Sequence, residues 1–146
     1  MTLVEMLVVL AIIGVAAGAT VLGIGAATRA PSAESEARRL AEEIQLAADD
    51  AMVTDRALAL EWSPNGYRLV VLGDDGSVDG TPSSGPFRRH FLPNGMRLAV
   101  VGATSPAVLG IDGTGVPFTA RLANATDRWS IGYDGLKAVA RRIPPG

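Results

Sequence analysis

The 146-residue chain contains no cysteine, one histidine and few aromatic side chains, and these absences exclude several kinds of protein. Without cysteine, the fold takes no stability from disulfides. A zinc site also lacks its usual ligands, because His90 has neither cysteine nor a second histidine to join it. No Gly-x-Ser-x-Gly elbow, phosphate loop or dinucleotide fingerprint occurs in the sequence. We therefore predict no catalytic residues, no metal and no cofactor from these motifs.

Charge of either sign is missing from the 23 residues between Glu5 and Arg29. As an α-helix, this run would be about 35 Å long, which is enough to cross a hydrocarbon core of about 30 Å. A helix of a soluble core rarely runs so far without a polar face. The run is too long for the apolar part of a secretory signal and lacks a basic segment before it. We predict that residues 1–28 form a single transmembrane helix.

Glu5 stands at the head of this apolar run, where a carboxylate is costly and usually has a partner. It is either an interfacial residue, favoured by the dipole at the start of the helix, or the partner of a cation from another chain. Gly14 and Gly18 lie four residues apart. Small residues at this spacing let membrane helices approach closely, so we predict a helix-packing role for both.

Residues 29–56 are predicted to form an amphipathic continuation of the helix after a joint at Pro31. Small and apolar side chains recur there at three-four spacing, which predicts a stripe that packs on a following sheet. The stripe consists of Ala37, Leu40, Ala41, Ile44, Ala47, Ala48 and Ala51. Most charged residues of the segment fall off it, namely Glu34, Arg38, Glu42, Glu43, Asp49 and Asp50.

Residues 57–146 change to short β-rich runs separated by turns, which predicts a head domain. Ser63-Pro64-Asn65-Gly66 is interpreted as a hairpin with an Asn-Gly turn, and residues 73–86 as a loop. Together with a helix, antiparallel strands in one or two sheets make an α+β domain. The eight predicted strands are 57–62, 67–72, 87–91, 96–101, 108–111, 116–122, 128–133 and 137–141.

The distribution of charge does not favour a nucleic-acid-binding protein. Residues 29–56 hold four Arg against seven acids, and residues 57–146 hold eight Arg and one Lys against seven acids. The head therefore has a net charge of only +2, without the strong basic excess of a nucleic-acid binder. Lys137, Arg141 and Arg142 form a small basic end that either contacts phosphates or an acidic partner, or keeps an edge strand soluble. The acidic stretch 74–80 lacks the ligand spacing of a calcium loop, so we interpret it as a turn.

Thr2-Leu3-Val4-Glu5, followed by Leu7-Val8-Val9-Leu10-Ala11-Ile12-Ile13-Gly14, resembles the start of mature type IV pilins and type II secretion pseudopilins. The resemblance implies that a prepilin peptidase processes the chain and that the new first residue, here Met1 in place of the usual phenylalanine, is N-methylated. It also implies that Glu5 meets the N-terminal amine of a neighbouring subunit during assembly.

Residues 111–119, Trp129-Ser130-Ile131 and Tyr133-Asp134-Gly135-Leu136 resemble the C-terminal pattern of H-type minor pseudopilins. The resemblance implies a pilin-like α+β fold, with a long N-terminal helical spine packed on an antiparallel β-sheet head.

The function implied is that of a minor pseudopilin near the tip of the type II secretion pseudopilus. Its expected partners are other major and minor pseudopilins, the prepilin peptidase and the inner-membrane secretion platform. The expected location is the bacterial inner membrane, with a single span and a periplasmic head. The resemblance implies no catalysis, so the chain is not expected to be an enzyme. The alternatives are a type IV minor pilin with a role in DNA uptake, and a single-span membrane enzyme or receptor with a ligand-binding β domain.

Overall fold

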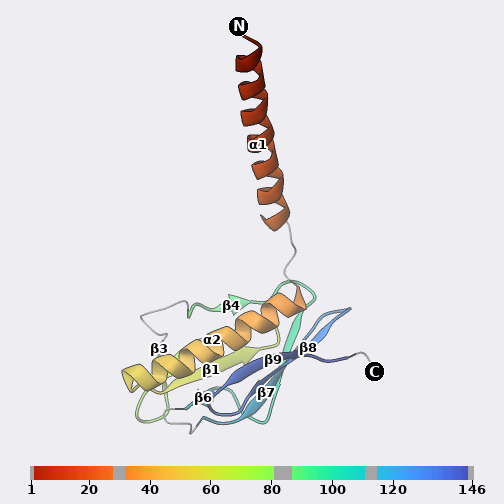
Figure 1. Ribbon diagram of the computed structural model, residues 1–146. Helices are drawn as coiled ribbons and strands as arrows, with labels where there is room; N and C mark the ends of the chain where they lie inside the picture. The colour runs from red at the N-terminus through yellow and green to blue at the C-terminus, as the bar shows by residue number, and fades with distance from the viewer. Residues whose placement is uncertain (1, 28–31, 81–86, 111–114, 145–146) are drawn as a thin grey trace. The chain divides into compact units, whose positions relative to one another are not determined.

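The computed structural model describes the backbone of residues 2–27, 32–80, 87–110 and 115–144, and the side chains of these residues except 16–27 (Figure 1). The chain divides into two compact units, residues 1–32 and residues 33–146. The second unit is called the head below. The predicted joint at Pro31 lies outside the described residues.

Helix α1 spans Leu3–Ala27, as the apolar run predicts. Thr2 caps its first turn, because the backbone nitrogen of Glu5 lies 3.4 Å from Thr2 Oγ1 and 3.1 Å from the Thr2 carbonyl oxygen. The side chains of residues 2–15 are all exposed. Within the described residues, no helix combines the length and the hydropathy of a membrane span.

Helix α2 spans Ala33–Thr54 and starts at the N-terminal signals that follow Pro31. Every residue of the predicted stripe from Ala37 to Ala51 is buried, so the prediction of a core-facing stripe is confirmed. The assignment of Glu43 to the polar face is wrong, because Glu43 is only 8% exposed. Glu36 is buried as well, at 6%. Both carboxylates lie at the border of the stripe, where polar partners cover them.

Nine strands form two antiparallel sheets beside α2 (Figure 1). Sheet A has the order β3-β2-β1-β6, with β4 also paired to β2, and sheet B has the order β5-β7-β8-β9. Sheet A contains β1 (Leu58–Ser63), β2 (Gly66–Leu72), β3 (Val78–Gly80), β4 (His90–Phe91) and β6 (Ala107–Leu109). Sheet B contains β5 (Arg97–Val101), β7 (Phe118–Ala123), β8 (Arg128–Tyr133) and β9 (Ala138–Arg142).

The predicted α+β class with antiparallel strands is confirmed, and three local predictions are corrected. Residues 73–86 are not wholly a loop, because β3 pairs with the end of β2. Only two residues of the predicted strand 87–91 pair in a sheet. The hairpin between β1 and β2 turns at Pro64-Asn65, and Gly66 is already paired with Ser63 and Phe91. Residue 111, the end of the predicted strand 108–111, lies outside the described part.

The core of the head lies between α2 and the facing sides of both sheets. Ile44 and Leu40 of α2 are fully buried there, together with leucines of sheet A and the inward side chains of sheet B. Gln45 ties α2 to edge strand β9: its Oε1 accepts a hydrogen bond from the Ala138 nitrogen at 3.1 Å, and its Nε2 donates to the Leu136 carbonyl oxygen at 3.3 Å. One helix therefore fixes the positions of both sheets.

Candidate functional site

Glu5 lies in the first turn of α1 and its side chain is exposed. The structure therefore presents this carboxylate to whatever surrounds α1, beside the exposed side chains of Leu3, Val4 and Leu7. A Cβ added at Gly14 would meet nothing within 4 Å, so this glycine leaves the helix surface open to a neighbour. Met1 and the surroundings of Gly18 lie outside the described residues.

The basic residues near the C-terminus do not share one face of the sheet. Arg141 and Arg142 are adjacent in β9, and successive side chains of a strand point to opposite faces. Arg142 forms an ion pair with Asp127 in the β7–β8 turn, with 2.7 Å between Nη2 and Oδ1. Lys137 lies in the turn before β9 and lines the same groove as Arg141. The structure thus groups Lys137 with Arg141 and separates Arg142 from them.

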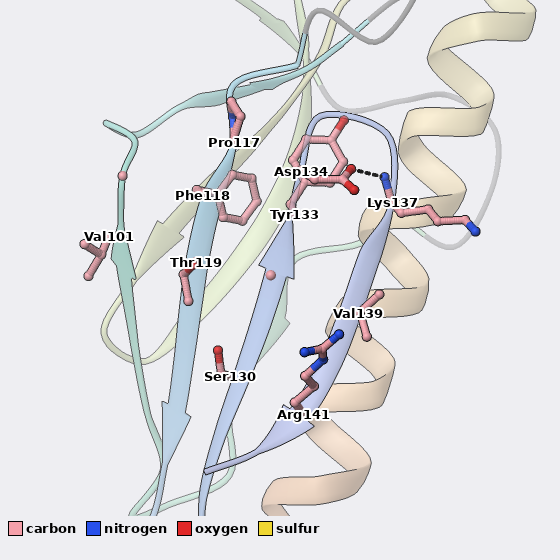
Figure 2. Close-up of a pocket in the computed structure, with 12 residues that line it drawn as sticks. Val101, Pro117, Phe118, Thr119, Ser130, Tyr133, Asp134, Lys137, Val139 and Arg141 are labelled. Carbon is pink, nitrogen blue, oxygen red and sulfur yellow. Dashed lines mark hydrogen bonds between the residues drawn. The ribbon is translucent and has the colours of Figure 1, made fainter.

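That groove lies on the face of sheet B that points away from α2, and its volume is about 590 Å³ (Figure 2). Small residues of the two central strands, Thr119, Ser130 and Gly132, line its floor. Val101 of β5 and Val139 of β9 border it on either side, and both are about half exposed. The groove forms because the side chains at the sheet edges are larger, and project further from the sheet, than those at its centre.

A polar cluster is buried at the other side of the head, between α2 and sheet A. His90 Nε2 lies 2.6 Å from Glu36 Oε2, and the imidazole ring packs on Tyr67 with 5.2 Å between ring centroids. One turn further along α2, Arg39 Nε donates to Glu43 Oε1 at 2.8 Å, and this hydrogen bond raises the pKa of Arg39. Burial, with the nearby Glu43 carboxylate second, raises the pKa of Tyr67 well above its usual range. The cluster attaches β4 to the helix rather than opening a site to solvent.

Two aspartates serve as turn caps. Asp75 Oδ1 accepts hydrogen bonds from the Ser77 hydroxyl and nitrogen at 2.6 and 2.9 Å, and these bonds lower the pKa of Asp75. Asp134 Oδ1 accepts from the nitrogens of Lys137 and Leu136 at 2.7 and 2.9 Å, which lowers the pKa of Asp134 (Figure 2). Across the described part of the chain, no three His, Cys, Asp or Glu side chains gather to hold a metal ion.

Sequence patterns did not indicate several residues that the structure brings together. Glu36 and His90 are 54 residues apart, and no local pattern pairs them. Arg97, Arg121 and Arg128 lie on the same face of sheet B as Arg141, because the register of the strands places them there. The alternation of charged and apolar residues within each strand is the signal that could have indicated their common face.

Known proteins resemble this chain in sequence and in fold. The model of the family described as "Type II transport protein GspH" matches residues 36–135. A comparison with curated protein sequences found no significant match. A solved structure of the minor pseudopilin EpsH from the type 2 secretion system of Vibrio cholerae is similar to this chain, with a TM-score of 0.65 and 15% identity. The alignment covers 80% of this chain and 99% of that one. A crystal structure of the same Vibrio cholerae pseudopilin has a TM-score of 0.55 and 12% identity, and covers 76% and 95% of the two chains.

Proposed function

Because the chain belongs to the type II transport protein GspH family, as a minor pseudopilin of the type II secretion system, we propose that it acts near the tip of the periplasmic pseudopilus and helps to export folded proteins. The family match covers the head, from the first turns of α2 to the β8–β9 turn. The family is one of structural subunits, and the two sheets held by α2 supply a rigid head of this kind.

We further propose that α1 anchors the chain in the bacterial inner membrane as a single span and enters the helical core of the pseudopilus on assembly. The support is the run of 23 residues without charge, together with the exposure of every described side chain from Thr2 to Val15. Exposed apolar surface of this extent is typical of a membrane or protein contact. The proposal also includes processing by a prepilin peptidase, with N-methylation at Met1, and contact with an inner-membrane secretion platform.

Glu5 is the residue on which assembly depends in this proposal. Its carboxylate pairs with the N-terminal amine of a neighbouring subunit and sets the register between adjacent α1 helices. The single observation that carries this role is the position of the carboxylate in the exposed first turn, at the head of an uncharged helix. A charge in apolar surroundings is stable only with a partner, and the described residues offer Glu5 none.

Replacement of the carboxylate tests the role. In cells of the source organism that lack the native chain, Glu5→Ala and Glu5→Gln are expected to reduce the secreted protein in the medium by at least about tenfold, equivalent to about 1.4 kcal/mol. Glu42→Gln is the matched control, because Glu42 is an exposed carboxylate on α2. The unfolding of the head should be unchanged in all three variants. Normal secretion with Glu5→Gln would contradict the role of the charge, and is what a single-span receptor predicts.

A further inference from the structure

The face of sheet B that points away from α2 carries arginine and no carboxylate. Alternate residues of its strands point inward, and those of β7 and β8 are buried, such as Leu122 and Ile131. The others point outward, and none of them is buried. These outward residues, called the outer face of sheet B, are Arg97, Ala99, Val101, Thr119, Arg121, Ala123, Arg128, Ser130, Gly132, Val139 and Arg141.

The strand register brings the four arginines of the outer face into two adjacent rows. Arg121 and Arg141 stand on either side of Ser130 in one row, and Arg97 and Arg128 on either side of Ala123 in the next. Neighbouring strands are about 4.8 Å apart, so the two arginines of a row are separated by roughly 10 Å at the backbone. Like charges at this distance repel one another, and no acid stands between them.

The nearest described carboxylates are already engaged and do not offset these charges. Asp127 is paired with Arg142, which points to the opposite face of β9. Asp134 accepts two backbone hydrogen bonds in its turn. Arg97 has a weak contact of 3.5 Å with the Asn65 side chain. The outer face is therefore a local concentration of positive charge on a head whose net charge is −2, with 12 basic and 14 acidic residues in 33–146.

An apolar groove adjoins the arginine rows. The next row across the sheet is Val101–Thr119–Gly132–Val139, so two valines enclose a floor made of threonine and glycine. This row and Arg141 line the groove of about 590 Å³ (Figure 2). A second depression of about 500 Å³ on the same face is lined by Arg121 and Arg128. Both depressions share Thr119 and Ser130, so they form one continuous surface.

We propose that the outer face of sheet B docks an acidic protein surface on a neighbouring pseudopilin head, with an apolar side chain of the partner in the groove. The guanidinium fork matches a carboxylate in two parallel hydrogen bonds, so rows of arginine suit a surface with several Asp or Glu residues. Charge complementarity of this kind fixes register and excludes wrong partners. This inference rests on the proposed function, because it takes the partner from the same pseudopilus.

The observations favour protein over nucleic acid as the partner. A nucleic-acid-binding domain usually has a basic excess over the whole domain, and this head is acidic overall. The groove also combines the apolar side chains of Val101 and Val139 with the cations of Lys137 and Arg141, so only part of its lining would suit a phosphate. An apolar pocket beside cationic side chains is instead typical of protein interfaces, in which an anchor side chain is surrounded by polar contacts.

The test is a titration of the fluorescently labelled head, residues 33–146, with the purified head of each sibling pseudopilin from the same system. The head alone is suitable because residues 33–146 form a compact unit that contains the whole buried core. We expect one sibling to bind, with an affinity that falls at high ionic strength. The double variant Arg121→Gln and Arg141→Gln should weaken this binding at least about tenfold, equivalent to about 1.4 kcal/mol.

The matched control is the double variant Arg56→Gln and Arg88→Gln, which removes the same charge from exposed positions outside the outer face. Its dissociation constant should stay within about twofold of that of the unmodified head, because the removed charges lie outside the proposed interface. Equal binding by the two double variants would overturn the inference and leave the proposed function intact. Absence of any sibling binding would overturn both the inference and a role for this head in tip contacts. Retention of duplex DNA that is lost in Arg121→Gln and Arg141→Gln would assign the face to nucleic acid and overturn the inference.

Discussion

The two helices of this chain contrast in how their side chains are used. Helix α2 is amphipathic and buries ten of its residues against sheets made by its own chain. Helix α1 is apolar around its whole circumference, and its described side chains are all exposed. Burial of apolar surface is the main favourable term in folding, and α2 gains it within the chain. In the function proposed above, α1 gains it from a membrane or from neighbouring subunits.

The contrast matches the proposed division of the chain into a head and an assembly helix. Within the described residues, the core of the head draws on α2, both sheets and the residues between them, and none of its members comes from α1. Changes in α1 should therefore act on assembly and leave the head folded, while changes in the stripe of α2 should unfold the head. The predictions below start with the largest effect, which compares the two helices, and continue with positions in the strands of the head.

The largest difference is expected between Ile44→Ala and Ile13→Ala. Ile44 is fully buried in the core and Ile13 is 58% exposed. Truncation of a buried isoleucine leaves a cavity and costs about 2–5 kcal/mol of unfolding free energy, whereas Ile13→Ala should change it by less than about 0.5 kcal/mol. Urea unfolding of the full chain in detergent measures both, because Trp62 and Trp129, the two tryptophans of the chain, lie in the head.

Val53→Ala is the control for Ile44→Ala, because Val53 is on the same helix and 85% exposed. Its unfolding midpoint should match that of the unmodified chain. A loss of stability in Ile13→Ala as large as that in Ile44→Ala would mean that α1 packs on the head, and would remove the distinction between the two helices.

A smaller difference is expected between Gly66→Ala and Gly14→Ala. A Cβ at Gly66 would collide with the backbone carbonyl of His90, because β4 crosses closely at this point of β2. Backbone cannot give way as a side chain can, so Gly66→Ala should cost about 1–3 kcal/mol in the same urea experiment. Gly14→Ala meets no atom within 4 Å and should leave the head unchanged.

Gly132→Ala is the matched control within a strand of the head, since its added Cβ would also meet nothing within 4 Å. It should be at least as stable as the unmodified chain, because alanine loses less backbone entropy on folding. If Gly132→Ala and Gly66→Ala destabilised the head equally, the close approach of β4 would not be the reason for glycine at position 66.

The stripe of α2 was predictable from the sequence because helical periodicity is a local property. Residues 37, 40, 41, 44, 47, 48 and 51 face one side of any helix, whatever packs on it. The burial of Glu36 was not predictable, because it depends on His90 arriving from a strand 54 residues away. The role of Gly66 was not predictable for the same reason, because its neighbour β4 is distant in sequence. The Asn-Gly pair, which is usually a turn signal, assigned Gly66 to the turn instead.

The candidate functional residues also differ in whether the sequence alone could predict them. Glu5 was predictable because one charge at the head of an uncharged run is visible in the sequence alone. Arg97, Arg121, Arg128 and Arg141 share a face only because β5 pairs with β7 and β9 with β8. The sequence places Arg142 beside Arg141, and the alternation of β9 separates them. The proposed docking face therefore required strand order as well as strand position.

The smallest effect is expected at the two tyrosines. Their hydroxyl groups differ in whether they form hydrogen bonds within the head. Tyr67 Oη is buried near the Glu43 carboxylate, but no atom of the described residues meets full hydrogen-bond geometry with it. Tyr133 Oη donates to the Gly135 carbonyl oxygen at 2.9 Å and accepts from the Gly110 nitrogen at 3.3 Å. At neutral pH we expect Tyr67→Phe to change stability by less than about 0.5 kcal/mol or to increase it, and Tyr133→Phe to cost about 1 kcal/mol.

Alkaline pH should make Tyr67→Phe more stable relative to the unmodified chain. Burial, followed by the Glu43 carboxylate, raises the pKa of Tyr67, so the folded head keeps the phenolic proton that the unfolded chain loses above about pH 10. Unfolding then releases a proton, and the unfolding free energy falls by up to about 1.4 kcal/mol per pH unit above this point. Below it, Tyr67 is protonated in both states and contributes no pH dependence. Urea midpoints between pH 8 and pH 11 should therefore fall less steeply in Tyr67→Phe than in the unmodified chain. Equal slopes would show that the Tyr67 hydroxyl reaches solvent and that α2 does not exclude water from this side of the head.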